Sequence, residues 1–137
     1  MHRVQFNPAL VGVSVVTTYL PSHSNPADDH YTYAYTITIS NAGDAPVQLL
    51  SRHWLITDAN EEVQEVRGEG VVGEQPIIPA GESFRYTSGA TLATPVGYME
   101  GSYFMVVREP MNIAPEELPT FEVPIPAFTL HTPTALN

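Results

Sequence analysis

Alternation of apolar and polar residues is the dominant pattern along this chain, and it predicts β-strands rather than helices. The strongest run extends from His30 to Ser40, where tyrosines and isoleucines occupy every second position and threonines most of the others. Turn-forming residues from Asn41 to Asp44 end it. The same pattern predicts further strands over residues 11–19, 46–57, 63–67, 84–88, 99–107 and 121–128.

Three residue types refine these strands. Gly101 interrupts the apolar face of its strand, which indicates a bulge or a close approach of another backbone. Pro124 and Pro126 cannot donate to a hydrogen-bond ladder, so the last strand is expected at a sheet edge. Residues 114–118 are expected to form at most a single helical turn.

About seven short strands without a convincing helix favour an all-β fold, an antiparallel β-sandwich of two sheets. Because the chain has no cysteine, it lacks the disulfide of antibody domains. A sandwich of the fibronectin type III/immunoglobulin-like kind, closer to fibronectin type III, is therefore expected. The length suits one domain, residues 1–130, followed by residues 131–137, which are expected to form a flexible C-terminal tail or a packing arm.

The charge balance limits the possible partners. The chain has five basic and fifteen acidic residues, all five basic ones arginines, and a net charge of −10. Nucleic acid is disfavoured, whereas a basic protein or a metal cation is favoured. Without cysteine or lysine there is no thiolate or Schiff-base chemistry.

No apolar run could span a membrane and no signal peptide is evident, so a cytoplasmic protein is expected.

Gly68, Gly70 and Gly73 form a G-x-G-x-x-G string. A dinucleotide site needs a helix after these glycines, and Pro76 forbids one. The favoured interpretation is backbone geometry, with the glycines letting the chain cross from one sheet to the other. A partner-binding loop is a second interpretation.

A phosphate site is the third interpretation of this loop. Glu69 and Glu74 would repel a phosphate, so this site would need Arg67, or a divalent cation held by the two glutamates, to offset their charge.

A second candidate is a loop with the ligand types that Co²⁺, Ni²⁺ or Zn²⁺ bind, namely His23, Asp28, Asp29 and His30. Irregular spacing in a proline-containing loop offers no preorganised geometry. A solvated hairpin loop is therefore favoured over a metal site.

Arg52, His53 and Trp54 place a basic pair beside a large aromatic residue on one predicted strand. Trp54 is expected to pack between the sheets, with Arg52 also inward and His53 outward. Alternatively, Arg52 lies at a strand end and pairs with a carboxylate such as Asp58.

A hydrolase would need Ser83 or Ser88 to combine with His53 and an aspartate. No nucleophile elbow or similar local motif is present, so the chain is not expected to be an enzyme.

From Phe6 to Leu130 the chain resembles the ApaG domain. Four motifs in fixed order carry the resemblance: Ser51-Arg-His-Trp54 with Ile56-Thr-Asp58, the segment from Gly68 to Pro76, residues 79–89 and residues 94–103. The resemblance implies a fibronectin type III-like sandwich in a small bacterial protein. It also implies a genetic association with cobalt resistance and magnesium efflux. Similar domains in eukaryotic F-box proteins and in a DNA-polymerase-interacting protein look like interaction modules.

These observations predict a non-catalytic binding module without a cofactor. Its expected contact surface is the glycine-rich segment with Gly68, Gly70 and Gly73 and its surroundings, Arg67, Glu69, Glu74 and Gln75, facing a protein partner that is basic. The alternative is a regulator that binds a divalent cation or a nucleotide pyrophosphate through the same glycine-rich segment.

Overall fold

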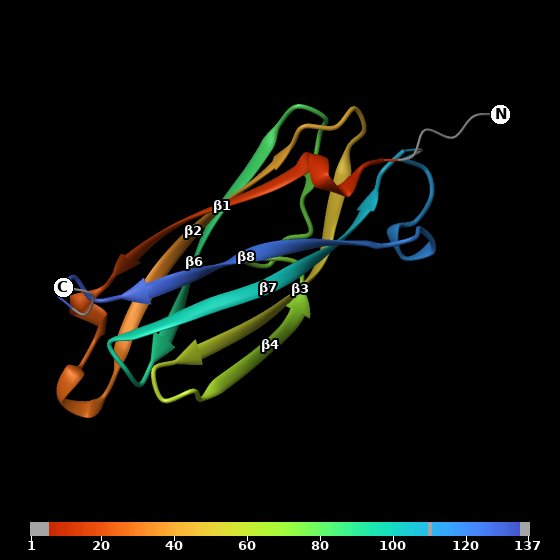
Figure 1. Cartoon of the computed structure of the whole chain (residues 1–137). Helices are drawn as coiled ribbons and strands as arrows, with labels where there is room; N and C mark the ends of the chain where they lie inside the picture. Colours follow the sequence, from red (N-terminus) through yellow and green to blue (C-terminus); the bar gives the residue numbers. More distant parts are fainter. Residues whose placement is uncertain (1–5, 110, 135–137) are drawn as a thin grey trace.

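The structure, a computed structural model, describes residues 6–109 and 111–134. Two antiparallel sheets pack face to face as a sandwich (Figure 1). One sheet has the order β1 (Val11–Tyr19), β2 (Tyr31–Asn41) and β6 (Ser83–Leu92). The other has the order β4 (Val63–Glu69), β3 (Val47–Asp58), β7 (Val96–Val107) and β8 (Phe121–His131), with the short β5 (Ile77–Ile78) also paired to β3.

The predicted fold class is confirmed, because the strands expected from alternation form an all-β, fibronectin type III-like sandwich. The strand β5 was not expected, since two residues are too few to show a period. The single helical turn expected near residue 116 is a 3-10 turn, Pro115–Glu117. Three similar turns begin with a proline, whose fixed φ suits a first helical position, at Pro8–Leu10, Pro21–His23 and Pro26–Asp28.

The core lies between the two sheets and is centred on Trp54, which is only 2% exposed. Its indole packs edge-on against Tyr35, Tyr103 and Phe128, with ring centroids 5.6, 6.3 and 5.9 Å away. Such edge-to-face pairs add to the stabilisation gained from apolar burial. The predicted core position of Trp54 is therefore confirmed.

Gly101 and the two prolines also lie where the sequence indicates. A Cβ at Gly101 would lie 2.1 Å from the carbonyl oxygen of His53, so only glycine allows β7 to approach β3 here. The register between β7 and β8 shifts between Met99 and Gly101, as a bulge requires. Pro124 and Pro126 lie on β8, at the edge of its sheet.

The strand β8 extends one residue into the segment that the sequence predicts as a tail or packing arm. His131 is the last residue of β8, and the Thr132 amide donates to the Pro95 carbonyl oxygen at 3.0 Å. Residues 135–137 of the predicted tail lie outside the described residues. None of the helical turns in the described part of the chain has the length and hydrophobicity needed to cross a membrane.

The two long sides of the sandwich differ. On one side β1 lies beside β8 (Figure 1). On the other side β6 and β4 are the edge strands of their sheets. A side-chain contact between them, from Gln64 Nε2 to the Thr91 carbonyl oxygen, is long at 3.4 Å. We call this second side the open side of the sandwich.

Candidate functional site

The glycine-rich segment forms a tight hairpin tip on the open side, between β4 and β5. The Gly70 amide donates to the Leu50 carbonyl oxygen at 2.8 Å. Val71 and Glu74 then exchange two backbone hydrogen bonds, of 2.8 and 2.9 Å, around a two-residue turn. Val72 and Gly73 at its centre have φ of 43° and 81°, and positive φ at both central positions is the mark of a type I′ turn. We call residues 70–75 the glycine loop.

Each glycine of the string has its own reason to be glycine. A Cβ at Gly68 would lie 2.7–2.9 Å from the Arg52 guanidinium, and one at Gly70 would lie 2.1 Å from the Glu74 carbonyl oxygen. Gly73 has free space around it, so its φ alone requires glycine. The prediction that the loop crosses between sheets is wrong, because β4 and β5 both pair with β3. The strand β5, and not a helix, follows the loop.

Arg52 lies on the inward side of β3 at the open side, as alternation predicts. Its Nη1 donates to the carbonyl oxygens of Glu69 and Gly70, at 3.1 and 2.8 Å, and thereby ties the end of β4 to β3. The alternative pairing with Asp58 is wrong. Asp58 is buried and its Oδ1 accepts from the amides of Asn60 and Glu62, at 2.8 and 3.0 Å.

A pocket of about 250 Å³ lies next to the glycine loop. Its walls come from both sheets and from the loop: Tyr35, Arg52, Trp54, Glu69, Val71, Val72, Gly73, Tyr86 and Ser88. This pocket was not predicted, because its residues lie on β2, β3, β4, β6 and the glycine loop and come together only when the sheets pack. Inward alternation of Tyr35, Trp54 and Tyr86 was the signal available in the sequence.

Two phenols meet in the core below this pocket. The hydroxyls of Tyr86 and Tyr103 form a short hydrogen bond that connects β6 to β7 across the sandwich. Burial raises the pKa of Tyr35, Tyr86 and Tyr103 above the usual value for a phenol, so all three are neutral near pH 7. The inner wall of the pocket therefore contains neutral hydroxyl groups.

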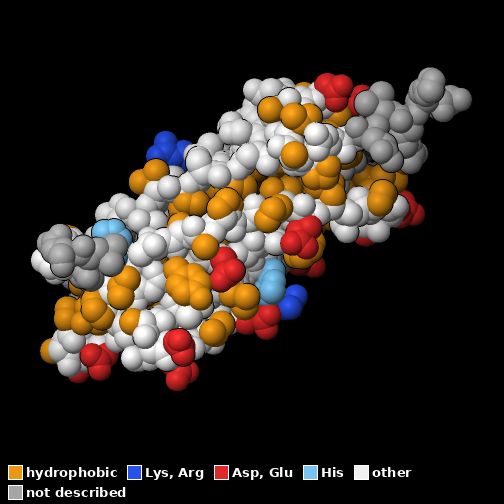
Figure 2. All heavy atoms as spheres, in the orientation of Figure 1, with side chains coloured by type: hydrophobic (Ala, Val, Ile, Leu, Met, Phe, Trp, Pro, Cys, Tyr) orange, Lys and Arg blue, Asp and Glu red, His pale blue; other side chains and the backbone are white. Residues whose placement is uncertain are grey.

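His53 faces outward, as expected, and belongs to a small ionic cluster. Its Nε2 lies 2.6 Å from Glu65 Oε2, and Arg67 Nη2 donates to the same oxygen at 3.1 Å. The hydrogen bond from His53, followed by the charge of Arg67, lowers the pKa of the Glu65 carboxyl. Figure 2 shows a histidine, an arginine and acidic side chains together on the part of this face formed by β3 and β4.

The four predicted contact residues divide into two pairs. Arg67 is engaged with Glu65, and Gln75 Nε2 donates to the Leu50 carbonyl oxygen at 2.9 Å, which supports the loop. Glu69 and Glu74 are exposed, and neither carboxylate has an ion-pair or hydrogen-bond partner among the described residues.

The histidine and aspartate loop lies at one end of the sandwich, within the two 3-10 turns that precede β2. Its side chains bond locally: Ser22 Oγ to His23 Nδ1 at 3.2 Å, and Asn25 Nδ2 to Asp28 Oδ2 at 2.8 Å. His30 pairs with Asn25 through an isolated bridge. Within residues 6–109 and 111–134 no three histidine or acidic side chains are grouped closely enough to hold a metal ion.

The residues considered for a hydrolase do not come together. Ser83 Oγ donates to Ser40 Oγ at 3.0 Å and lies on β6, whereas the outward-facing His53 lies on β3 in the other sheet. Ser88 lines the pocket on the inner side of the sandwich. Neither serine has a histidine as hydrogen-bond partner in the described part of the chain.

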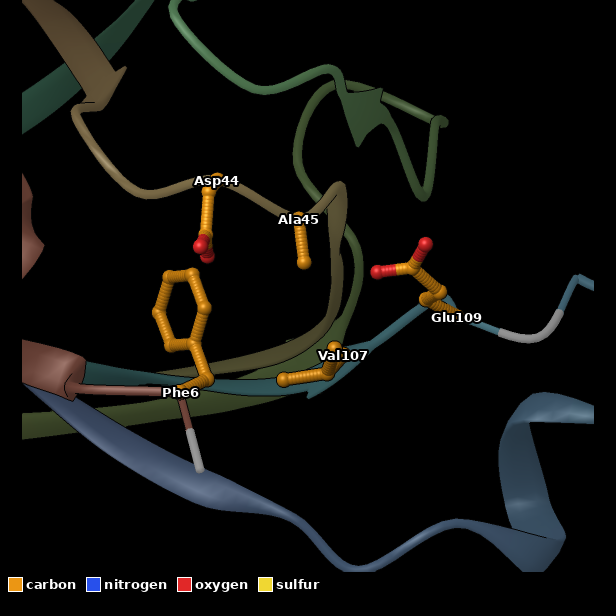
Figure 3. A pocket seen from close by; sticks show the side chains of 5 residues that line it. All are labelled: Phe6, Asp44, Ala45, Val107 and Glu109. Atoms are coloured by element: carbon orange, nitrogen blue, oxygen red, sulfur yellow. The ribbon is translucent and has the colours of Figure 1, made fainter. Parts of the chain in front are cut away.

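A smaller pocket, of about 130 Å³, lies near the N-terminal segment and is lined by Phe6, Asp44, Ala45, Val107 and Glu109 (Figure 3). Phe6 packs on Phe121 at 5.5 Å between ring centroids. The two carboxylates of the pocket, those of Asp44 and Glu109, come from different loops and lie on either side of Ala45 in Figure 3. None of the described residues that line this pocket is basic.

Comparisons with known proteins agree with this architecture. Residues 21–107 match the family described as the ApaG domain. The chain is 55% identical over 125 residues to Protein ApaG of Ralstonia nicotianae, covering 91% of this chain and 94% of the relative. It is 53% identical over 127 residues to Protein ApaG of Thiobacillus denitrificans, covering 93% and 94%.

A solved structure gives the same result. A crystal structure of a Bordetella pertussis protein designated ApaA superposes with a TM-score of 0.81 at 48% identity, covering 91% of this chain and 95% of that one. The family match spans more than half of the chain and includes β2, β3, β4, the glycine loop and the pocket residues. On this evidence the chain belongs to the ApaG family.

Proposed function

We propose that this ApaG-family domain is a non-catalytic binding module that engages a protein partner through the glycine loop. The observation that carries the proposal is Val72. This β-branched residue has a φ of 43°, which such side chains rarely adopt, and its side chain is 53% exposed. Asparagine or glycine would fit the turn with less strain. Strain of this kind concentrates at sites of recognition, where the side chain itself is needed.

Charge beside Val72 favours a basic partner. Glu69 and Glu74 lie on either side of the turn, and neither carboxylate has a partner among the described residues, whereas Asp58 and Glu65 are engaged within the fold. Complementary charge raises the association rate more than the lifetime of a complex. A family link to cobalt resistance and magnesium efflux would then be indirect, through the partner.

The alternative, a regulator that binds a divalent cation or a nucleotide at the glycine loop, has less support. The amides of Gly70, Val71 and Glu74 already donate to backbone carbonyl oxygens, so they are not available to a phosphate. No helix N-terminus follows the loop to add its dipole.

The test is affinity capture from a bacterial lysate with the full chain, followed by binding kinetics with any purified partner. Val72→Asn keeps a residue suited to the turn and removes the apolar side chain. In this variant, relief of the backbone strain at position 72 stabilises the fold, and loss of the partly buried valine side chain destabilises it. The two effects should cancel to within about 1 kcal/mol, so the variant should still fold. We expect this variant to lose the partner.

Glu69→Gln with Glu74→Gln should slow association at low salt, and the defect should shrink toward 1 M salt, where the Debye length is about 3 Å. Glu117→Gln, an exposed acid in the 3-10 turn before β8, is the matched control and should behave like the unmodified chain. A partner that binds Val72→Asn with unchanged affinity would contradict the proposal. Saturable binding of ATP or a divalent cation at the loop would favour the alternative.

A further inference from the structure

The pocket beside the glycine loop combines apolar and polar wall groups. It lies on the open side, between the inner face of β6 and the hairpin tip. Aromatic and branched side chains form one part of its wall: Tyr35, Trp54, Val71, Val72 and Tyr86. Most of the accessible lining is polar, so these side chains supply only part of the surface that a ligand would meet.

Only one of the three nitrogens of the Arg52 guanidinium, Nη1, makes hydrogen bonds among the described residues. Both Nη1 hydrogens are accounted for by the carbonyl oxygens of Glu69 and Gly70. Nε and Nη2, which form the other edge of the group, have no hydrogen-bond partner among the described residues, and no carboxylate lies within 4.0 Å. That free edge has the geometry to bind a carboxylate through two parallel hydrogen bonds.

The backbone holds this free edge in place. Gly68 leaves room for the guanidinium to lie over β4, where a Cβ would approach to 2.7–2.9 Å. The two bonds from Nη1 fix the plane of the group, so little side-chain entropy remains to be lost when a ligand binds.

Neighbouring polar groups are donors as well. Ser88 and Tyr35 place hydroxyls in the wall of the pocket. The indole Nε1 of Trp54, another wall residue, is buried and has no acceptor in the described part of the chain. Because this nitrogen is shielded from solvent, a ligand in the pocket would meet the face of the indole and not its N–H.

We propose that this pocket binds a carboxylate carried by a short apolar or aromatic group, with the carboxylate on Nε and Nη2 of Arg52 and the apolar group against Val72 and Tyr86. This site overlaps the surface that the proposed function assigns to a protein partner. Where the carboxylate belongs to such a partner, the inference rests on that proposed function. A free organic acid and the C-terminal residue of a polypeptide present the same chemistry. A doubly charged phosphate is disfavoured, because Glu69 lines the pocket, Glu74 flanks the turn and the chain carries a net charge of −10.

The test titrates the full chain with phenylacetate and with the neutral phenylacetamide. Trp54 is the only tryptophan, so its emission and its indole N–H resonance report on the pocket directly. We expect phenylacetate to bind saturably, in the millimolar range of a ligand with few atoms. Phenylacetamide should bind at least tenfold more weakly. Equal binding of the two, or tighter binding of pyrophosphate, would overturn the proposal without any variant.

Two variants remove the free edge in different ways. Arg52→Lys keeps the charge and loses the planar group, and Gly68→Ala keeps the arginine and displaces its guanidinium. Each should weaken phenylacetate at least tenfold, as expected for a lost charge-assisted hydrogen bond. Arg67→Lys, on the outer face, is the matched control and should leave the affinity unchanged. Wild-type affinity in a folded Arg52→Lys protein would refute the assignment.

A further comparison identifies the source of the carboxylate. A short peptide ending in phenylalanine is titrated with a free and with an amidated C-terminus. Binding at least tenfold tighter than phenylacetate, abolished by amidation, supports a polypeptide terminus. Equal affinity of the peptide and phenylacetate supports a small acid, and binding by neither refutes the site. Failure to capture a protein partner would leave these titrations intact, so the two proposals fail separately.

Discussion

Replacing Asn41 with alanine should lower the free energy of unfolding by about 3 kcal/mol. Asn41 ends β2 and is 1% exposed. Its Nδ2 donates to the carbonyl oxygens of Ala45 and Ile78, at 2.8 and 3.0 Å, and its Oδ1 accepts from the Gly43 amide at 3.0 Å. Alanine would remove these three hydrogen bonds to backbone groups. Losing each costs about 1 kcal/mol or more where water cannot replace the bond.

Urea unfolding followed by far-UV circular dichroism measures this change, and the slope m should stay constant if only stability has changed. A loss of about 3 kcal/mol should lower the melting temperature by roughly 10 °C in a domain of this size. Asn60→Ala is the matched control. Asn60 is exposed and its side chain makes no hydrogen bond among the described residues, so its replacement should change stability by less than about 0.5 kcal/mol.

Asn41→Asp should make the free energy of unfolding depend on pH in a defined direction. Its carboxylate would face the carbonyl oxygens of Ala45 and Ile78, so the pKa of the new carboxyl should be raised above about 3.9, its unfolded value. The unfolded state then releases its proton first, and stability falls as pH rises through the folded pKa. A loss below about 1 kcal/mol in Asn41→Ala would refute the assigned hydrogen bonds, and so would a stability difference between Asn41→Asp and the unmodified chain that is independent of pH between about 3 and 7.

Two further predictions concern the contacts between and within the sheets. Gly101→Ala should destabilise the fold by at least about 2 kcal/mol, because its Cβ would meet the His53 carbonyl oxygen at 2.1 Å, whereas Gly12→Ala has nothing within 4 Å of the new Cβ and should be neutral in the same unfolding assay. Burial raises the pKa of Tyr33 to about 12, so stability should be complete below about pH 10 and fall as pH rises toward 12. Urea unfolding at a series of alkaline pH values measures how the free energy of unfolding falls with pH. This fall should be shallower for Tyr33→Phe, and an unchanged fall would show that Tyr33 ionises freely in the folded protein.

The sequence by itself determined which residues form strands and which faces those strands bury. Period-two alternation is a local property, and it survives folding because each strand must place one face against the core. It therefore predicted the inward tyrosines and isoleucines of β2, the buried Trp54 and the outward His53. Residues with special backbone demands were equally informative: Gly101 lies at a close approach, and Pro124 and Pro126 lie on an edge strand.

Only the tertiary structure decided which strands are neighbours and which distant side chains meet. The glycine string gave no sign that β4 and β5 share β3, so the predicted crossing between sheets was wrong. Arg52 could have paired with Asp58 by proximity in sequence, but the packing of β4 offered it the carbonyl oxygens of Glu69 and Gly70 instead. The pocket joins Tyr35, Trp54 and Tyr86 from three strands. Such contacts depend on the register and packing of two sheets, which a local pattern does not specify.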